Sequence, residues 1–319
     1  MSITEEQIQE FKETGLLVID EVLTQDEVEN ARNNLHKQLL HFNIDHTSII
    51  NQEAKSKDLI KFYEPRLKSP ASRIFYSKWK LLDVHLHNNV IKNMNTLLNA
   101  TYNSNSKDFQ HPFGKFNKSL CYVDRICYRL PDHIYSEGGL SLHLDRNPLD
   151  PYLLNSKTPL KKWRPIQAFV SLTDQYGGES GGLRVVKNFH KTIDDYFSKS
   201  SIIDKCEGGE FFRMHGHNYD SLHKECHPVN APAGSLVLWD NKLPHETCDK
   251  LTSLDTREVV YVGFLPSVEI NKKYVAEQLN AIKQNIPPPA YITDKKETSD
   301  RDWDEKDLNL DQKHCLGFL

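Results

Sequence analysis

The stretch Gly234-Ser235-Leu236-Val237-Leu238-Trp239-Asp240-Asn241-Lys242-Leu243-Pro244-His245 decides the class of fold. After the glycine it holds a run of apolar residues, and a polar turn with a proline ends that run, which is typical of a short β-strand. Further runs rich in β-branched and aromatic residues lie at 120–130, 140–145, 165–173, 183–186 and 258–265. Because no helices separate these runs as they do in βαβ units, the sequence predicts a sandwich or barrel and argues against a doubly wound sheet.

The regions around these strands predict a single domain over residues 1–319. We expect a helical N-terminal part with an insertion at 1–118 and a strand-rich core at 119–270, the latter interrupted by an insertion at 187–230. Residues 271–319 are expected to form a C-terminal tail, because a proline run and a charged stretch follow the last predicted strand.

The N-terminal part carries clear helix signals. Ser2 and Thr4 are candidate caps, and Gly15 can end the helix that follows them, before a short apolar strand at 16–19. A second helix should begin at Thr24, because Thr24 and Glu27 have capping-box spacing. Its apolar face is formed by Val28, Ala31, Leu35 and Leu39.

Composition excludes several classes of protein. The chain has 40 Lys and Arg against 44 Asp and Glu, a net charge of −4, which gives no bulk attraction to nucleic acid. No apolar run approaches the roughly 18–20 residues that span a bilayer, so no membrane partner is expected. The acidic N-terminus does not resemble a signal peptide, the six cysteines form no Cys-x-x-Cys pair, and Gly317-Phe318-Leu319 is not a peroxisomal address. We therefore expect a soluble cytoplasmic protein.

A set of metal-binding side chains lies on the predicted strands. In Leu142-His143-Leu144-Asp145, residues two apart share one face of a strand, so His143 and Asp145 can converge. His245, which follows the strand and turn quoted above, can supply a third ligand from a neighbouring strand, which would complete the facial triad of non-heme Fe(II) enzymes. Arg257 lies twelve residues later and is suited to grip a carboxylate in bidentate fashion.

With these residues the chain resembles the phytanoyl-CoA dioxygenase (PhyH-like) family of Fe(II)/2-oxoglutarate oxygenases. Further stretches are similar to that family: 11–19 to its N-terminal helix and strand, 167–174 to its central strand, 181–190 to its glycine-rich turn, and 308–319 to the tail of some members. Two departures are that Lys187-Asn188-Phe189-His190 replaces the usual Pro-Gly-Ser-His and that Val259 replaces a serine after Arg257.

The resemblance implies a mainly β fold, a double-stranded β-helix (jelly roll) core flanked by helices. It implies that His143, Asp145 and His245 hold Fe(II) and that Arg257 binds the far carboxylate of the co-substrate 2-oxoglutarate. Tyr128 is the candidate for the missing hydroxyl contact, and Gln167 is a further cofactor-binding candidate. The implied reaction uses O2, with ascorbate in support, to hydroxylate an unactivated C–H bond and release succinate and CO2. Asp145 favours hydroxylation over halogenation, which uses a small residue there.

Each of these side chains also has an ordinary structural interpretation. His143 can be a core histidine paired with Asp145, Arg257 can form an ion pair with Asp255 or Glu258, and Tyr128 can be simple core packing. The chain can also be a catalytically idle relative that binds metal or 2-oxoglutarate, or a zinc-dependent jelly-roll enzyme. Succinate formation with iron, and its absence with zinc, separates these classes.

Three rival motifs remain. Gly178-Glu179-Ser180-Gly181-Gly182 matches the nucleophile elbow of serine hydrolases, but a strand follows Ser180 where the elbow requires a helix. Histidines and a cysteine between 215 and 227 lack standard zinc spacing. The basic cluster 161–164 can contact a phosphate or lie on the surface, and Arg146 and Arg125 favour an anionic or polar small-molecule substrate unless they form surface ion pairs.

Overall fold

The computed structural model describes residues 2–41, 44–51, 74–152, 154, 160–198, 210–291 and 301–319. Its ten strands are β1 (Leu16–Ile19), β2 (Ser119–Arg129), β3 (His143–Leu144), β4 (Ile166–Ser171), β5 (Leu183–Val186), β6 (Phe212–Arg213), β7 (Cys226–Pro228), β8 (Leu236–Asp240), β9 (His245–Thr247) and β10 (Arg257–Pro266). Its α-helices are α1 (Glu5–Thr14), α2 (Gln25–His41), α3 (His46–Ile50), α4 (Asn88–Ala100), α5 (Ile193–Ser198), α6 (Asp220–Glu225), α7 (Glu269–Gln284) and α8 (Leu310–Leu316), and Trp79–His85 forms a π-helix.

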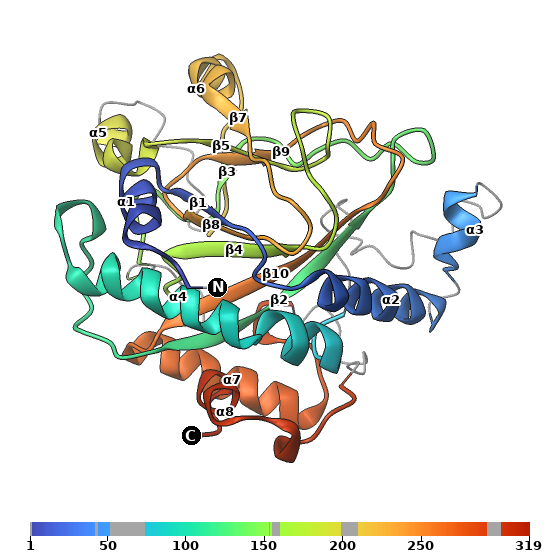
Figure 1. The fold of residues 1–319 in the computed structure, drawn as a ribbon. Coiled ribbons are helices and arrows are strands. Elements are labelled where there is room, and N and C mark those ends of the chain that lie inside the picture. The colour runs from blue at the N-terminus through green and yellow to red at the C-terminus, as the bar shows by residue number, and fades with distance from the viewer. Residues whose placement is uncertain are drawn as a thin grey trace.

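The strands form two five-stranded antiparallel sheets, which face each other in Figure 1. The larger sheet has the order β1-β8-β4-β10-β2, and the smaller has the order β6-β3-β9-β5-β7. Helices α4, α7 and α8 cover the outer face of the larger sheet, whereas α5 and α6 lie beside the smaller one. The fold is therefore a mixed one, of helices and antiparallel sheets.

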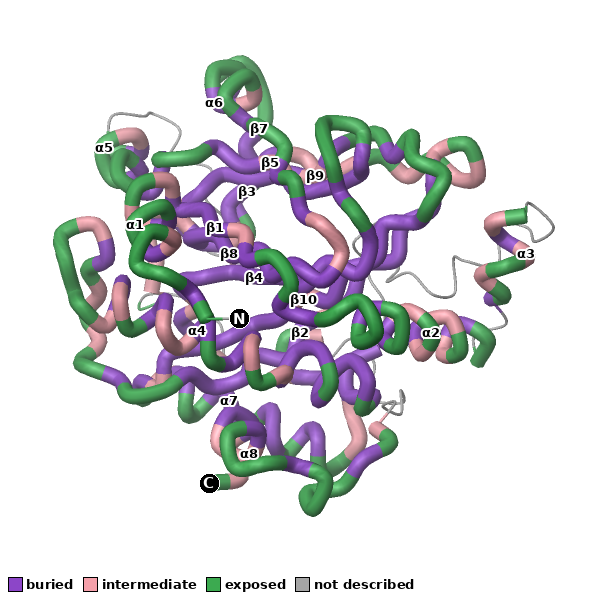
Figure 2. The backbone as a smooth tube through the Cα atoms, viewed as in Figure 1, coloured by how far each residue is buried: buried purple, intermediate pink, exposed green. Residues whose placement is uncertain are grey.

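Each face of the larger sheet has its own hydrophobic core, because side chains alternate along its strands. Phe169, Trp239 and Val259 point inward and share one core cluster with Val185 of the smaller sheet. The outward side chains pack against the helices. Figure 2 shows the result, with buried strands at the centre and exposed residues on the outer helices and loops.

The sequence signals at the N-terminus are confirmed. Thr4 caps α1 through a capping box with Gln7, and Gly15 ends the helix in the left-handed region at φ 75°. Thr24 and Glu27 form the expected reciprocal bonds, 2.8 Å from the Thr24 N–H to the carboxylate and 3.3 Å from the Glu27 N–H to the hydroxyl. The predicted apolar face of α2 is the buried one.

Other parts differ from the expectation. The fold is less dominated by strands than predicted, and residues 271–319 are not a simple tail, since α7 and α8 pack against β2. The predicted strand at 140–145 is reduced to His143–Leu144, and β6, β7 and β9 were not predicted. Parts of both predicted insertions, 52–73 and 199–209, lie outside the described residues.

Two further expectations concern the environment of the chain. In the described part of the chain, no helix has both the length and the apolar character needed to cross a membrane. Five cysteines in the described part are free and buried: Cys121, Cys127, Cys226, Cys248 and Cys315.

Candidate metal centre

His143, Asp145 and His245 meet on the smaller sheet, on its side facing the inter-sheet core. The antiparallel pairing of β3 and β9 places His143 directly opposite His245, and their ring centroids are 4.2 Å apart. Asp145 lies two residues beyond His143 and presents its carboxylate to both rings. One ligand atom from each residue lies within 4.8 Å of the other two.

Backbone hydrogen bonds orient both imidazoles. Nδ1 of His143 lies 2.8 Å from the carbonyl oxygen of Ser141, and Nδ1 of His245 lies 3.0 Å from that of Leu243. A carbonyl only accepts, so each Nδ1 carries a proton, and each Nε2 is the ring nitrogen that faces the carboxylate. This is the arrangement that fixes the tautomer of metal-binding histidines.

The two Nε2 atoms face the Asp145 carboxylate at 3.6 Å and 3.9 Å, too far for hydrogen bonds. Burial and the adjacent His143 lower the pKa of His245 to about 3, so its ring is neutral near pH 7. Burial would raise the pKa of Asp145, but the two histidines, Arg164 and Gln167 outweigh it and lower that pKa to about 2. Two imidazole Nε2 atoms and one carboxylate therefore converge on one point, a donor set that suits Fe(II).

Gln167 of β4 and Arg164, which lies just before that strand, fix the carboxylate. Nε2 of Gln167 donates a 2.7 Å hydrogen bond to Asp145 Oδ2, and Nη2 of Arg164 lies 3.7 Å from the same oxygen. Gln167 is 4% exposed, and its Oε1 has no hydrogen-bond partner among the residues that are described. The structure thus places this predicted cofactor-binding residue against a candidate metal ligand.

Aromatic rings cover the histidines. The Phe211 ring lies 4.8 Å from that of His143, and the Trp239 ring lies 5.5 Å from that of His245. Phe211 belongs to the predicted insertion 187–230, so this segment reaches the candidate metal centre.

Arg257 projects from β10 into the inter-sheet core and is 3% exposed. Its Nε donates to Gln175 Oε1 at 2.9 Å, its Nη1 lies 3.1 Å from Cys127 Sγ, and the Tyr261 side chain is close to its guanidinium. None of these partners is a carboxylate, and none of the ion pairs found in the described residues includes Arg257. A buried guanidinium without an anion is costly, so this position favours a carboxylate ligand.

The structure corrects two expectations about residues near Arg257. An ion pair between Arg257 and Asp255 or Glu258 does not form, because both carboxylates pair with Arg32. Tyr128 lies on the opposite face of β2 from Cys127, within the outer core, and its hydroxyl is bonded to Nδ1 of His46 at 2.7 Å. Tyr128 therefore faces away from Arg257.

Tyr261 is the hydroxyl that sequence reasoning missed. It lies four residues after Arg257 on the same strand, so both side chains point to the same face. That i, i+4 spacing on a strand was the available signal.

A second group of metal-binding type occurs in the described residues, formed by His36, His46 and Glu258 on the outer face of β10. Here the carboxylate is already used: Oε1 is bonded to His36 at 2.8 Å and Oε2 to Arg32 at 2.9 Å. Thr256 also donates to Oε1 at 2.7 Å. A metal would have to displace these partners, so this group is an ion-pair network.

The rival motifs do not assemble into sites. Ser180 donates to the Gly177 carbonyl, β5 follows it, and Asp240 is occupied by the Tyr102 hydroxyl at 2.7 Å. The histidines at 217 and 223 each pair with a carboxylate, Asp220 and Glu246, and they belong to no metal-binding group in the part of the chain that is described.

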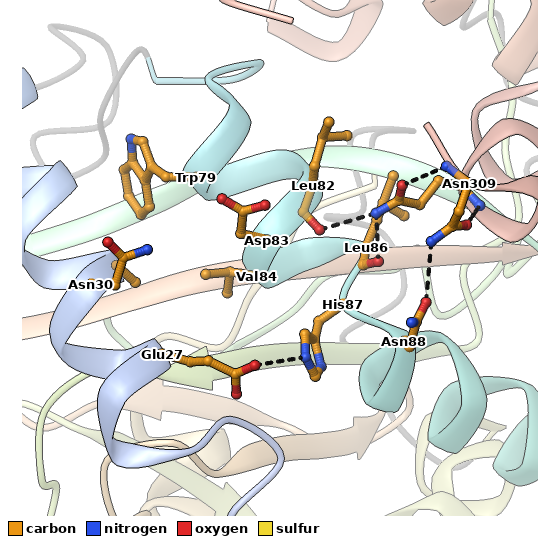
Figure 3. A pocket seen from close by; sticks show the side chains of 12 residues that line it. Glu27, Asn30, Trp79, Leu82, Asp83, Val84, Leu86, His87, Asn88 and Asn309 are labelled. Carbon is orange, nitrogen blue, oxygen red and sulfur yellow. Dashed lines mark hydrogen bonds and ion pairs between the residues drawn. The ribbon is translucent and has the colours of Figure 1, made fainter. Parts of the chain in front are cut away.

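Two cavities are relevant to ligand binding. One opens beside Asp145 and is small, about 20 Å³. A larger one of about 280 Å³ lies between α2, the π-helix, α4 and the start of α8 (Figure 3). Figure 3 shows Glu27 paired with His87 at its lower wall, and no candidate metal ligand lines it.

Comparison with known proteins gives a family and a fold. The family model described as Gig2-like matches residues 146–315, more than half of the chain, including His245 and Arg257 and starting directly after Asp145. No sequence among the curated proteins matches the chain significantly.

Three solved structures are similar. The GlcNAc Inducible Gene 2 protein (DUF1479) of Candida albicans is 18% identical with a TM-score of 0.68, over 99% of this chain and 76% of that one. A hypothetical protein of Escherichia coli is 17% identical with a TM-score of 0.72, over 99% of this chain and 81% of that one. HygX of Streptomyces hygroscopicus, solved with nickel and 2-oxoglutarate, is 18% identical with a TM-score of 0.50, over 84% of this chain and 88% of that one.

Proposed function

The chain belongs to the Gig2-like family, and we propose that it is an Fe(II)- and 2-oxoglutarate-dependent oxygenase that hydroxylates a C–H bond of a small molecule. The observation that carries this proposal is the convergence of His143, Asp145 and His245, with each Nδ1 bonded to a backbone carbonyl so that each Nε2 faces the same point. The motifs shared with phytanoyl-CoA dioxygenases and the fold shared with HygX support it.

The winding of the chain supports a double-stranded β-helix. Strands β2 and β4 lie in the larger sheet, while β3 and β5 lie in the smaller one. After two further strands of the smaller sheet, β8, β9 and β10 alternate between the sheets again. We propose that this alternation is the jelly roll implied by the sequence resemblance.

Each side chain has a defined task in this proposal. Iron held by the triad would supply the oxidation of 2-oxoglutarate by O2, which yields succinate and CO2 and transfers one oxygen atom to the substrate. Arg257, with Tyr261, would bind the far carboxylate of 2-oxoglutarate by charge-assisted hydrogen bonds. Gln167 would hold Asp145 in place, and Phe211 and Trp239 would exclude water from the histidines.

The experiment that tests this function is anaerobic reconstitution with Fe(II) and 2-oxoglutarate. We expect one iron per chain and a visible charge-transfer band that appears only when both are present, followed by succinate release on exposure to air. His245→Ala should lose the band, whereas His36→Ala, which removes a histidine from the other cluster, should keep it. Iron binding without succinate release would favour an idle relative, and succinate release unaffected by His245→Ala would overturn the assignment.

A further inference from the structure

We propose that the substrate carries an anionic group, a carboxylate or a phosphate, which pairs with Arg146 in the cavity beside the metal centre. This inference rests on the proposed function, because it assigns that cavity to the substrate. Three cations line it, Arg146, Lys162 and Arg164, next to the candidate metal ligand Asp145.

Two of the three cations already have anionic partners. Lys162 forms an ion pair with Glu210, and Nη1 of Arg164 lies 3.0 Å from Asp124 Oδ2. Both also lie over the Tyr122 ring, at 5.2 Å and 4.9 Å from its centroid. These contacts explain the two charges as parts of the cavity wall.

Arg146 differs from both. It is 8% exposed, and its Nε is buried and finds no hydrogen-bond partner in the described part of the chain. The one hydrogen bond of its guanidinium within the described residues is a long one, 3.5 Å from Nη1 to Asn241 Oδ1. No carboxylate among those residues forms an ion pair with it, and the nearby Asp240 carboxylate is occupied by Tyr102 and by the backbone of Lys242.

A guanidinium in this state is poorly compensated. Burial removes its hydration, and a neutral amide at 3.5 Å returns little of that free energy. A bound carboxylate or phosphate restores it through two parallel N–H···O bonds. Because Arg146 directly follows Asp145, an anion held there would place the attached carbon chain beside the metal centre.

The other buried guanidinium without a carboxylate, Arg257, lies on β10 in the larger sheet. Two separate sites thus require anions, one for the co-substrate and one for the substrate. The test must therefore measure the two ligands independently.

Binding is measured first on the metal-free protein by calorimetry, with inorganic phosphate and propionate as anionic probes and propionamide as the neutral match of propionate. We expect one of the two anions to bind and propionamide to bind at least tenfold more weakly, and the preferred anion identifies a phosphate or a carboxylate substrate. Arg146→Met should lower the affinity for the anion at least tenfold. Arg146→Lys should lose part of that affinity, since a point charge lacks the two-pronged geometry. Lys161→Gln, the same loss of charge outside the cavity, should change nothing.

The same variants are then loaded with Ni(II), and their affinity for 2-oxoglutarate is measured. Arg146→Lys should bind 2-oxoglutarate like the wild type, and thermal unfolding confirms that it is folded. Equal binding of propionamide and propionate, no binding of either anion, or an Arg146→Lys affinity for the anion equal to wild type would overturn the proposal. A loss of 2-oxoglutarate affinity would also overturn it by assigning Arg146 to the co-substrate. Failure of the wild type to bind Ni(II) would instead overturn the proposed function, while the metal-free anion result stands.

Discussion

Gln167 is the side chain that holds Asp145 most directly, through the 2.7 Å bond to Oδ2. Removing a group that orients a metal ligand typically costs 10–100-fold in metal affinity. We therefore expect Gln167→Leu to weaken Fe(II) or Ni(II) binding by about 10–100-fold, measured by competition with a chelator. The expected change is in affinity only, because all three ligand atoms remain.

Gln175 provides the matched control for this substitution. It is also a buried glutamine, but it bonds Arg257 and not Asp145. Gln175→Leu should keep the metal affinity and weaken the binding of 2-oxoglutarate. Unchanged metal affinity in Gln167→Leu would mean that Asp145 is held by its backbone and by Arg164 alone.

Arg257 and Tyr261 make a prediction about the co-substrate. A charge-assisted pair contributes about 1.5–3 kcal/mol, so Arg257→Leu should raise the Kd for 2-oxoglutarate by at least about tenfold, with Arg257→Lys intermediate. Tyr261→Phe should raise it several-fold, whereas Tyr128→Phe should leave it unchanged, because Tyr128 faces the outer core. Titration of the charge-transfer band measures all four variants. An effect of Tyr128→Phe larger than that of Tyr261→Phe would reverse this assignment.

The contrast between these two tyrosines shows what single residues reveal in a sequence. The candidate metal-binding triad could be predicted from the sequence, because the spacing of His143 and Asp145 places them on one face of a strand and His245 follows a clear strand. Tyr128 was misplaced because its role depends on the register that pairs it with Glu258, which points outward. The pairing register between strands far apart in the chain cannot be predicted from the sequence of either strand. The spacing between Arg257 and Tyr261, by contrast, lies within the single strand β10 and could be.

At the scale of elements, Gly15 joins α1 to β1 in a conformation that other residues resist. Its φ is 75°, and a Cβ there would lie 2.8 Å from Nδ1 of His190 and 3.0 Å from Leu243. We expect Gly15→Ala to lower the free energy of unfolding by about 1–3 kcal/mol, from the left-handed backbone and the contact together. Urea denaturation measures this change.

Gly114 is the control, because a Cβ built there meets no atom within 4 Å. Gly114→Ala should change stability by no more than about 0.5 kcal/mol. Equal effects at the two glycines would show that the α1–β1 junction relaxes around a methyl group.

Element prediction succeeded where the signal was local. Capping residues and apolar spacing located α1 and α2, and apolar runs located β8 and β10. It failed for β9, since three residues carry no periodicity and exist as a strand only through pairing with β3 and β5. Helix α7 was not predicted, although it has a buried face at helical spacing: Tyr274, Val275, Leu279 and Ile282.

At the scale of the molecule, the His36, His46 and Glu258 network joins two helices to the larger sheet. The rings of His36 and His46 stack at 3.7 Å between α2 and α3, and Arg32 and His36 both bond Glu258 of β10. Burial raises the pKa of Glu258, but His36 and Arg32 outweigh it and lower that pKa to about 2. Such contacts bring together segments more than 200 residues apart, so no local pattern could predict them.

This network predicts how stability depends on pH. Burial and the charge of His36 lower the pKa of His46 from 6.5 to about 4. The unfolded chain therefore binds that proton first, and stability should fall as pH drops from 6.5 to 4, with Glu258 adding a further loss below about 4.5. Allowing for solvent screening of the partly exposed ring, His46 should contribute about 1–2 kcal/mol. Urea denaturation of metal-free protein at several pH values should show this loss reduced in His46→Gln, and an identical pH slope in that variant would refute the role of His46.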